Sequence, residues 1–491
     1  MHVAAVIAAG TSGEAEQQAR ASLRRGADLV EFRIDALRHP TAGDLRKLAS
    51  ALGPRAIATV RSSAQGGFRG LDRGARHALL RDACHLPFRY VDVELTTDAD
   101  HLGEYAKLAK SRAKDLIVSH HFDGPTEPER VAEILDACLA AGRVGKVATP
   151  VASVDEAVAL VDLARQRSKA RFVLIGTGDA GGLTRALAAD TGQELQYASG
   201  NRATAPGQLS LEAALRVRSK DAFVLGLLGH PLGHSISPVI HDAALRAAGL
   251  HGLYLPFDLG RTSLEPFLQA AEGLRLRGLN VTSPYKETVA DLMDELDGDA
   301  EVLGAVNTVV LHEGWAKGHN TDVFGFRMSL RSLGLRLGDR RVLVVGAGGA
   351  AKAVVHVLLR EGAQVALTNR TPARAEGLAD FFDDSVDVLS LDEVTRKGPW
   401  DVLVNATSVG TAGLDAGLPV PEETLARTGY VYDLVYNPPE TPLIAAARKR
   451  GLRATNGLEM LLQQAAKSFE LWTGQSAPIE AMKRATKEAP L

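Results

Sequence analysis

The sequence predicts an α/β protein with a (β/α)8 barrel, then a smaller α/β domain, and then a doubly wound nucleotide-binding domain. Short β-branched segments alternate eight times with polar helical segments over about the first 215 residues. A glycine-rich turn joins an apolar strand to a helix near Gly346. A chain of 491 residues suits about three domains. We expect their bounds at 1–217, 222–336 and 337–456, with a helix at 457–474 that returns to the second domain.

Composition excludes several classes of function. The chain has 56 Lys and Arg residues against 59 Asp and Glu residues, a net charge of -3, so it has no electrostatic footprint for nucleic acid or an acidic membrane. Cys84 and Cys138 lack the spacing of a disulfide framework or a zinc site. The start of the chain lacks a basic segment, and no apolar run reaches about 18 residues. We therefore expect a cytoplasmic protein without nucleic-acid or membrane partners.

The first region contains eight predicted strands. They are 3–7, 29–34, 56–60, 90–94, 116–119, 145–148, 172–175 and 195–198. Eight such strands with intervening helices can close a barrel, and chemistry then collects at the carboxyl ends of the strands. Polar residues stand at or near those ends: Glu31, Arg33, Asp35, Arg61, Glu94, His120, Lys146, Thr184 and Arg185.

Lys146 is the most informative of these residues. It lies among glycines and small apolar residues, where an ammonium group would be poorly solvated. Desolvation and neighbouring cations lower the pKa of a lysine, and the neutral amine can then attack a ketone. Equally, Lys146 can be a barrel residue that pairs with Glu94 or Glu31. His120 can be a general base or a strand-end residue bonded to a backbone carbonyl, and either His120 or its neighbour His121 can be the solvated one.

The first region resembles type I 3-dehydroquinate dehydratase, a TIM-barrel enzyme. The likeness rests on Glu31-x-Arg33-x-Asp35, Arg61-Ser62, His120, Lys146-Val147-Ala148, the segment 178–185 and the segment 204–208. It implies that Lys146 forms a covalent Schiff base with the substrate ketone and that His120 transfers protons. It also implies substrate contacts from Glu31, Arg33, Arg61, Arg185, Thr204 and Gln208.

One departure from that family concerns the histidine. The family usually has Glu-Gly-Gly four residues after the arginine of the third strand, where this chain has Gln65-Gly66-Gly67. A carboxylate would stabilise a charged histidine, whereas glutamine offers only a neutral hydrogen bond. We predict a lowered pKa for His120 and a slower dehydratase, unless Glu31 or Glu94 replaces the missing carboxylate.

The second region offers side chains suited to hydroxyl and carboxylate groups. Ser237, before Pro238, can cap a helix or hold a carboxylate. The segments 280–286, 304–308 and 320–322 each follow or end a predicted strand. Lys286 and Asp322 can form a surface ion pair, or an acid directed at a ketone. The glycine-rich turn a few residues downstream favours the second interpretation.

The glycine-rich turn of the third region predicts a dinucleotide-binding site. Gly346 and Gly348 let the backbone turn tightly beside a pyrophosphate, and Gly349 and Ala350 open a helix whose amides face the anion. An ordinary βα turn is the alternative. The next strand, 364–368, ends in Asn369, Arg370 and Thr371 with no acid at its tip, so Arg370 and Arg374 suit the 2′-phosphate of NADP. Arg374 can instead be a solvated helix residue.

Residues 223–474 resemble shikimate dehydrogenase, in which a substrate domain is followed by a Rossmann domain. The likeness rests on the segments 235–238, 280–286, 304–308, 320–322, 369–371, 405–410, 433–438 and 457–474. It implies that Lys286 and Asp322 form the catalytic pair. The implied substrate ligands are Ser235, Ser237, Asn280, Thr282, Asn307, Tyr436 and Gln464. The implied NADP(H) ligands are Gly346, Gly348, Gly349, Ala350, Asn369, Arg370, Thr371, Arg374 and Thr407.

Together the two resemblances imply consecutive steps of the shikimate pathway of aromatic amino acid biosynthesis. 3-Dehydroquinate would lose water to give 3-dehydroshikimate, which NADPH would reduce to shikimate. The partners are these small molecules, with no metal, and the oligomeric state is open. Alternatives are a quinate dehydrogenase in the second half, or a metabolite sensor without turnover, although a sensor would not need a Schiff-base lysine.

Overall fold

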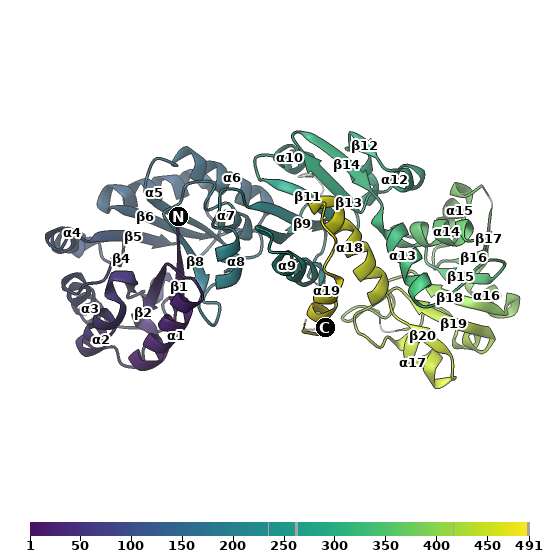
Figure 1. Cartoon of the computed structure of the whole chain (residues 1–491), viewed down its shortest axis with the longest axis horizontal. Coiled ribbons are helices and arrows are strands. Elements are labelled where there is room, and N and C mark those ends of the chain that lie inside the picture. The colour runs from purple at the N-terminus through teal and green to yellow at the C-terminus, as the bar shows by residue number, and fades with distance from the viewer. Residues whose placement is uncertain (234, 261–263, 384, 416, 489–491) are drawn as a thin grey trace. The chain divides into compact units, whose positions relative to one another are not determined.

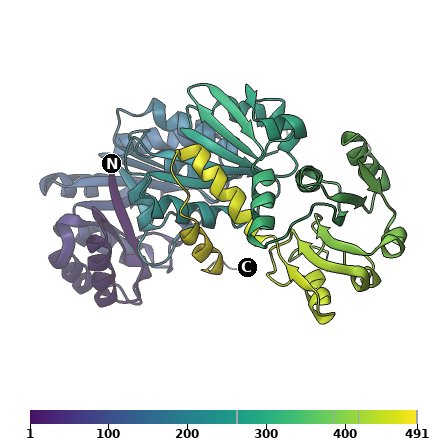
Figure 2. The ribbon, with the colours of Figure 1, turned by 45° about the vertical axis from the view of Figure 1, so that its right-hand side comes forward.

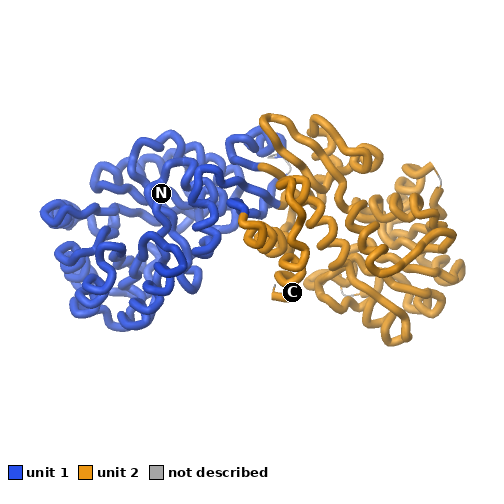
Figure 3. Tube along the Cα trace, in the orientation of Figure 1, with its two compact units in different colours: residues 1–226, 250–276 blue, residues 227–249, 277–491 orange. Residues whose placement is uncertain are grey.

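The structure is a computed structural model that describes residues 1–233, 235–260, 264–383, 385–415 and 417–488. The chain divides into two compact units (Figure 3). Unit 1 contains Met1–Gly226 and Leu250–Leu276, and unit 2 contains Leu227–Gly249 and Arg277–Leu491. Among the described residues, no helix combines the length and the apolar character that a membrane crossing requires.

Unit 1 contains an eight-stranded sheet, several of whose strands are labelled in Figure 1. The strand order is β7-β6-β5-β4-β3-β2-β1-β8. Its strands pair in parallel, and β1 pairs with both β2 and β8, so the sheet curls into a nearly closed barrel. The strands are β1 (His2–Ile7), β2 (Leu29–Arg33), β3 (Ala56–Thr59), β4 (Tyr90–Glu94), β5 (Asp115–His121), β6 (Val144–Pro150), β7 (Phe172–Thr177) and β8 (Leu195–Ser199).

Helices follow the strands of the barrel, as the sequence predicts. They are α1 (Ser12–Arg24), α2 (Ala42–Leu52), α3 (Arg73–His85), α4 (Leu102–Ser111), α5 (Pro128–Ala141), α6 (Val154–Gln166), α7 (Gly182–Ala186) and α8 (Leu211–Arg216). Thr11, Asp72 and Ser153 are the N-cap residues of α1, α3 and α6. In each case the side-chain oxygen accepts a hydrogen bond from the backbone N–H three residues later. Every strand contributes to an apolar core cluster that includes Val6, Ile57 and Tyr197.

A second sheet has the order β10-β9-β11-β13-β14-β12. Its strands are β9 (Phe223–Gly229), β10 (Gly252–Asp258), β11 (Leu276–Val281), β12 (Glu295–Leu296), β13 (Thr308–His312) and β14 (Trp315–His319). The accompanying helices are α9 (Ser237–Ala247), α10 (Leu264–Gln269), α11 (Lys286–Ala290), α12 (Gly298–Leu303) and α13 (Thr321–Ser332). β13 pairs antiparallel with β11 and β14, so this is a mixed sheet.

A third sheet is parallel, in the order β17-β16-β15-β18-β19-β20. Its strands are β15 (Arg341–Val345), β16 (Gln364–Thr368), β17 (Val386–Val388), β18 (Trp400–Asn405), β19 (Thr428–Asp433) and β20 (Arg453–Thr455). Its helices are α14 (Gly349–Arg360), α15 (Pro372–Phe381), α16 (Leu391–Lys397) and α17 (Pro442–Lys449). The strand order reverses between β15 and β18, which is where a Rossmann fold binds its ligand.

The C-terminal helices α18 (Leu458–Thr473) and α19 (Ile479–Glu488) return to the second sheet. α18, yellow in Figure 2, lies beside α13. Trp472 donates an indole hydrogen bond of 2.9 Å to the carbonyl of Val309, and the Ser468 hydroxyl accepts one of 3.0 Å from Asn280. The fold class predicted from the sequence, a barrel followed by two further α/β parts, is confirmed.

Two candidate active sites

The barrel contains a cavity of about 430 Å³ at the carboxyl ends of its strands. Seven residues predicted from the sequence line it: Glu31, Arg33, Arg61, Lys146, Arg185, Thr204 and Gln208. They come from β2, the segment after β3, β6, α7 and the loop after β8. They meet because the carboxyl ends of parallel barrel strands share one rim.

Lys146 lies on β6 and is almost completely buried. Its ammonium donates to Asp92 at 2.9 Å and to Glu31 at 3.5 Å, and lies 3.9 Å from the centre of the Tyr197 ring. The predicted partner Glu31 is therefore present, but Asp92 takes the place expected for Glu94. Asp92 was not predicted from the sequence, because it lies in the middle of β4 and not at the end of the strand. Position 92 is two residues before Glu94, and thus on the same face of β4.

The structure corrects the choice between the two neighbouring histidines. His121 lines the cavity with Lys146, whereas His120 is absent from the lining. Ser119 pairs with Lys146 across β5 and β6, and its hydroxyl bonds to Asp92 inside the barrel. Side chains alternate along a strand, so His121 shares the inner face with Ser119, and His120 points the other way. His120 instead packs edge-on against Phe122.

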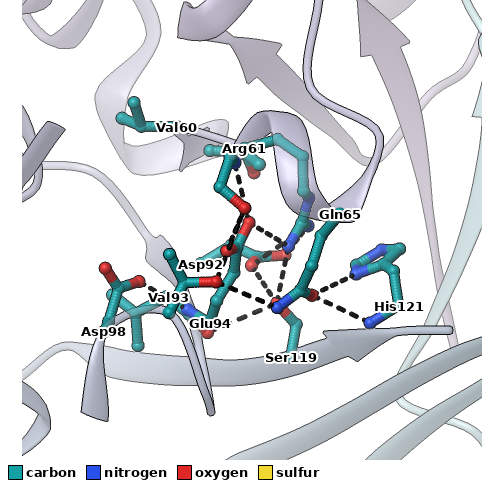
Figure 4. A network of polar contacts seen from close by, with 12 residues as sticks. Val60, Arg61, Gln65, Asp92, Val93, Glu94, Asp98, Ser119 and His121 are labelled. Atoms are coloured by element: carbon teal, nitrogen blue, oxygen red, sulfur yellow. Dashed lines mark hydrogen bonds and ion pairs between the residues drawn. The ribbon is translucent and has the colours of Figure 1, made fainter. Parts of the chain in front are cut away.

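Gln65 contacts His121 directly (Figure 4). Its side-chain carbonyl accepts the His121 backbone N–H at 2.9 Å and lies 3.4 Å from Nδ1. Its amide group donates to the hydroxyls of Thr96 and Thr97, both at 3.3 Å, which fixes the orientation of the side chain. Burial, followed by the charges of Arg61 and Lys146, holds the pKa of His121 well below its usual value. A neutral imidazole is thus held beside Lys146.

The candidates to replace the missing carboxylate are engaged elsewhere. Glu31 accepts from Thr59 at 2.8 Å as well as from Lys146. Glu94 accepts the Ser62 hydroxyl at 2.6 Å and the Arg61 guanidinium at 3.3 Å (Figure 4). The pKa of His120 is lowered by burial, as predicted, and burial also holds the pKa of His121, the histidine that Gln65 contacts, well below its usual value.

Arg61 is held inside a charged network. Its guanidinium donates to Asp92 at 3.1 Å, to Glu94 at 3.3 Å and to Ser119 at 2.8 Å. Burial raises the pKa of Asp92, but the charges of Arg61 and Lys146 outweigh it and lower that pKa overall. Arg61 thus anchors the carboxylates that surround Lys146, and can act on a bound anion chiefly through its charge.

Arg185, on α7, has a different environment. It is 4% exposed, and within the described ranges no carboxylate forms an ion pair with it. Burial alone lowers the pKa of Arg185 to about 10, and its Nε has no hydrogen-bond partner. A carboxylate in the cavity would satisfy this guanidinium. Nearby, the backbone and hydroxyl of Thr204 both donate to the side-chain carbonyl of Gln208, which closes the loop after β8.

Unit 2 contains a second cavity, of about 450 Å³. The sequence-predicted residues that line it are Ser235, Ser237, Asn280, Thr282, Lys286, Asn307, Asp322, Ala350, Thr407, Tyr436 and Gln464. They come from the second sheet, the third sheet and α18. One cavity therefore joins the predicted catalytic pair to part of the predicted nucleotide loop.

Lys286 and Asp322 form an ion pair in the wall of this cavity. The ammonium donates to one carboxylate oxygen at 2.6 Å, and the Asn307 amide donates to the other at 2.9 Å. The side-chain carbonyl of Asn307 in turn accepts the backbone N–H of Thr321 at 2.7 Å. The carboxylate is thus fixed on both sides, and the lysine is partly buried rather than on the surface.

Polar groups around the pair form a second layer. Asn280 donates to Thr308 and Ser468, and Gln464 lies 3.5 Å from the Asn307 amide. Sequence reasoning missed Ser468, four residues after Gln464 on one face of α18.

Ser237 does not cap α9, because Ile236 is the N-cap residue and no side chain caps the helix. Burial raises the pKa of Tyr436, which keeps its hydroxyl neutral.

The glycine-rich turn has the geometry that a dinucleotide needs. Gly346 has φ of +112°, and a Cβ there would lie 2.9 Å from Thr407 and 3.0 Å from the Ala406 backbone. Gly348 is the N-cap residue of α14, and a Cβ on it would meet no atom within 4 Å. Gly346 thus permits the tight turn, while Gly348 and Gly349 leave the start of α14 open to an anion.

The residues after β16 lie outside the cavity lining. Asn369 donates to the carbonyl of Thr371 at 2.9 Å, and the side chains of Arg370 and Arg374 are exposed. No acidic residue occurs between Thr368 and Arg374. These residues fit NADP rather than NAD, because two unengaged guanidinium groups suit a 2′-phosphate and no carboxylate is present to hold a ribose hydroxyl.

Models of known families match separate parts of the chain. The model of the type I 3-dehydroquinase family matches residues 3–221. The shikimate dehydrogenase substrate binding domain matches residues 227–309, the shikimate / quinate 5-dehydrogenase family matches 328–417, and the shikimate 5′-dehydrogenase C-terminal domain matches 457–487.

Individual relatives agree for the second half. The chain is 43% identical over 257 residues to a shikimate dehydrogenase (NADP(+)) of Caldanaerobacter subterraneus, covering 51% of this chain and 92% of the relative. It is 44% identical over 275 residues to that of Methanopyrus kandleri, covering 54% and 95%. The Thermus thermophilus shikimate 5-dehydrogenase, solved with NADP(H) and shikimate, is 36% identical, with a TM-score of 0.50 and coverage of 54% and 99%. The chain belongs to the shikimate dehydrogenase family, and carries a type I 3-dehydroquinase domain ahead of its dehydrogenase half.

Proposed function

We propose that this chain catalyses two consecutive reactions, the dehydration of 3-dehydroquinate and the NADPH-dependent reduction of 3-dehydroshikimate to shikimate. The observation that carries the proposal is that each half has its own cavity with an ion-paired lysine in its wall. We infer domains at 1–217, 222–336 with 457–474, and 337–456, because each range contains one of the three sheets.

In the barrel, Lys146 would attack the substrate ketone and lose water to form an iminium. The iminium acidifies the neighbouring C–H bond, because it accepts the electron pair left behind. His121, a neutral base beside Lys146, would remove that proton and then protonate the departing hydroxyl. Water would finally release the product and restore the amine. Arg185 is the group we assign to the substrate carboxylate, with Arg33, Thr204 and Gln208 beside it.

In unit 2, NADPH would supply a hydride to the ketone carbon when bound. We assign its pyrophosphate to Gly346, Gly348, Gly349 and Ala350, its 2′-phosphate to Asn369, Arg370, Thr371 and Arg374, and a further contact to Thr407. Lys286 would stabilise the developing alkoxide and donate a proton to it, while Asp322 and Asn307 hold the ammonium in place.

The remaining assignments concern substrate recognition. Ser235, Ser237 and Tyr436 would bind the carboxylate, and Asn280, Thr282, Asn307 and Gln464 would bind the ring hydroxyls. Hydroxyl and amide groups suit these roles because each can donate and accept. A site that hydrogen-bonds a substrate hydroxyl strongly rejects an analogue without it, which provides discrimination between related cyclic acids.

The test is an assay of purified protein that follows NADPH absorbance from two starting substrates. Both 3-dehydroquinate and 3-dehydroshikimate should consume NADPH, the former after a lag. Borohydride added with 3-dehydroquinate should trap a covalent adduct, which peptide mass spectrometry should locate at Lys146. Oxidation of quinate in preference to shikimate would overturn the second assignment. Absence of turnover and of an adduct would indicate a binding protein.

A further inference from the structure

Two histidines and a glutamate meet on the outside of the barrel, away from both cavities. His77 lies on α3, His101 precedes α4 and Glu104 lies in its first turn. One potential ligand atom from each residue lies within 4.8 Å of the other two. We propose that these three residues bind a divalent transition-metal ion of the zinc class.

The distances suit a metal after small side-chain movements. Nε2 of His77 lies 3.8 Å from Oε2 of Glu104, and Nδ1 of His101 lies 4.0 Å from the same oxygen. Ligand atoms of a tetrahedral zinc ion lie roughly 3.3 Å apart, since each bond is about 2.0–2.1 Å long. The three side chains are 25%, 33% and 41% exposed, so they have room to close that difference.

The donor set and its surroundings favour this class of ion. Imidazole nitrogens with one carboxylate suit zinc, whereas magnesium and calcium prefer oxygen ligands. The two imidazole rings are stacked, with centroids 3.8 Å apart and planes 23° apart, so one ring must rotate to direct its in-plane lone pair at a shared ion.

Neighbouring groups leave the ligand atoms available. Nδ1 of His77 lies 2.7 Å from the Tyr105 hydroxyl, which can accept a hydrogen bond from Nδ1–H and so leave the Nε2 lone pair available to a metal. Arg81 lies 3.3 Å from Oε1 of Glu104, and the proposed ligand is the other oxygen, Oε2.

The ion would tie α3 to the segment between β4 and α4. Arg76, beside His77, already pairs with Asp98 in that segment. Thr96 and Thr97 of the same segment accept hydrogen bonds from Gln65, which contacts His121. A bound metal would therefore brace the loop that orients Gln65, although it would lie outside the catalytic cavity.

The test is titration of the untagged full-length protein with Co²⁺, a spectroscopic substitute for zinc. Visible absorption bands of a low-symmetry cobalt site should appear with one ion per chain, and Zn²⁺ but not Mg²⁺ should abolish them. Glu104→Gln and His101→Asn should each weaken binding about tenfold or more. His85→Ala, which removes an exposed histidine of the same helix, is the control and should bind like the parent.

Thermal unfolding gives a second readout that does not depend on activity. Saturating Zn²⁺ should raise the Tm of the parent and the His85→Ala protein by about 2–4 °C, but not that of Glu104→Gln. Equal cobalt affinity in the parent and both ligand variants would show that the metal binds elsewhere and would overturn the proposal. So would the absence of cobalt bands in the parent.

Discussion

His120 and His121 are chemically identical neighbours with opposite surroundings. His121 lines the cavity with Lys146, while His120 is absent from the lining and packs edge-on against Phe122. A shift of one residue along a strand moves a side chain to the other face of the sheet. The chemistry available to each imidazole is therefore decided by its position along β5, because successive side chains point to opposite faces.

Gln65 provides a test of how His121 is tuned. Gln65→Glu would place a carboxylate at the position that now accepts the His121 backbone N–H and lies 3.4 Å from Nδ1. A negative charge there favours the imidazolium and raises the histidine pKa. Because His121 must be neutral to accept a proton, the acid limb of the dehydratase pH profile should move up by about one pH unit.

The matched control is Gln65→Met, which keeps the volume of the side chain but supplies no charge. Its acid limb should stay at or below that of the parent. A Gln65→Glu protein with the parental pH profile would contradict the role assigned to position 65, provided that its thermal unfolding is unchanged.

His241 gives a prediction about stability. It is completely buried on α9, 5.2 Å from the Trp472 ring. Burial lowers the pKa of His241 to about 3, and a hydrogen bond with Asn280 offsets only part of that effect. The unfolded chain binds this proton near pH 6.5, so stability is full above that value and falls as the pH decreases toward 3.

When the pH falls from 7 to 5, protonation of His241 in the unfolded chain should lower the free energy of unfolding of unit 2 by about 2 kcal/mol. His241→Gln should remove that pH dependence, whatever its stability at pH 7. Denaturant unfolding at the two pH values measures the difference. The exposed His312→Gln is the control and should retain the parental slope. An unchanged slope in the His241→Gln protein would refute this assignment.

At the scale of elements, the third sheet places the nucleotide site where its strand order reverses. β15 lies between β16 and β18, so the turn at Gly346 and the loop containing Thr407 meet at the ends of adjacent strands. The residues after β16 extend that edge with two exposed arginines. Selectivity for the cofactor should therefore depend on a short segment that lies outside the described cavity lining.

Arg370→Ala and Arg374→Ala test this element. Each should raise the KM for NADPH about tenfold, because a charge-assisted hydrogen bond to phosphate contributes roughly 1.5–3 kcal/mol. The KM for NADH, which lacks the 2′-phosphate, should change little. Steady-state kinetics with both cofactors give the ratio. Arg448→Ala, an exposed arginine paired with Glu440, should affect neither. An equal loss with both cofactors would argue against a phosphate contact.

At the scale of the whole molecule, each unit carries a complete set of candidate catalytic groups. Lys146, its partners and Arg185 all lie in unit 1, and Lys286, Asp322 and the nucleotide turn all lie in unit 2. The two chemical steps should therefore be separable by single substitutions.

Lys146→Met should lower the rate of NADPH consumption from 3-dehydroquinate at least about 100-fold. The rate from 3-dehydroshikimate should stay unchanged. Lys286→Met should abolish both, while 3-dehydroshikimate still accumulates from 3-dehydroquinate. Removing Lys146 leaves Glu31 without its buried ion-pair partner and Asp92 paired only with Arg61, so Lys146→Arg is a second variant that keeps the charge but not the nucleophile. Loss of both activities in that properly folded variant would contradict separable sites.

The sequence by itself was sufficient for the fold class, the glycine-rich turn and many of the polar residues that line each cavity. These depend on local periodicity and on where strands end, which a linear pattern records. The tertiary structure alone decided that His121 faces Lys146, that Asp92 is its partner and that Ser468 supports Asn280. Those pairings depend on the register between strands and on contacts across as many as 188 positions, which no local pattern encodes.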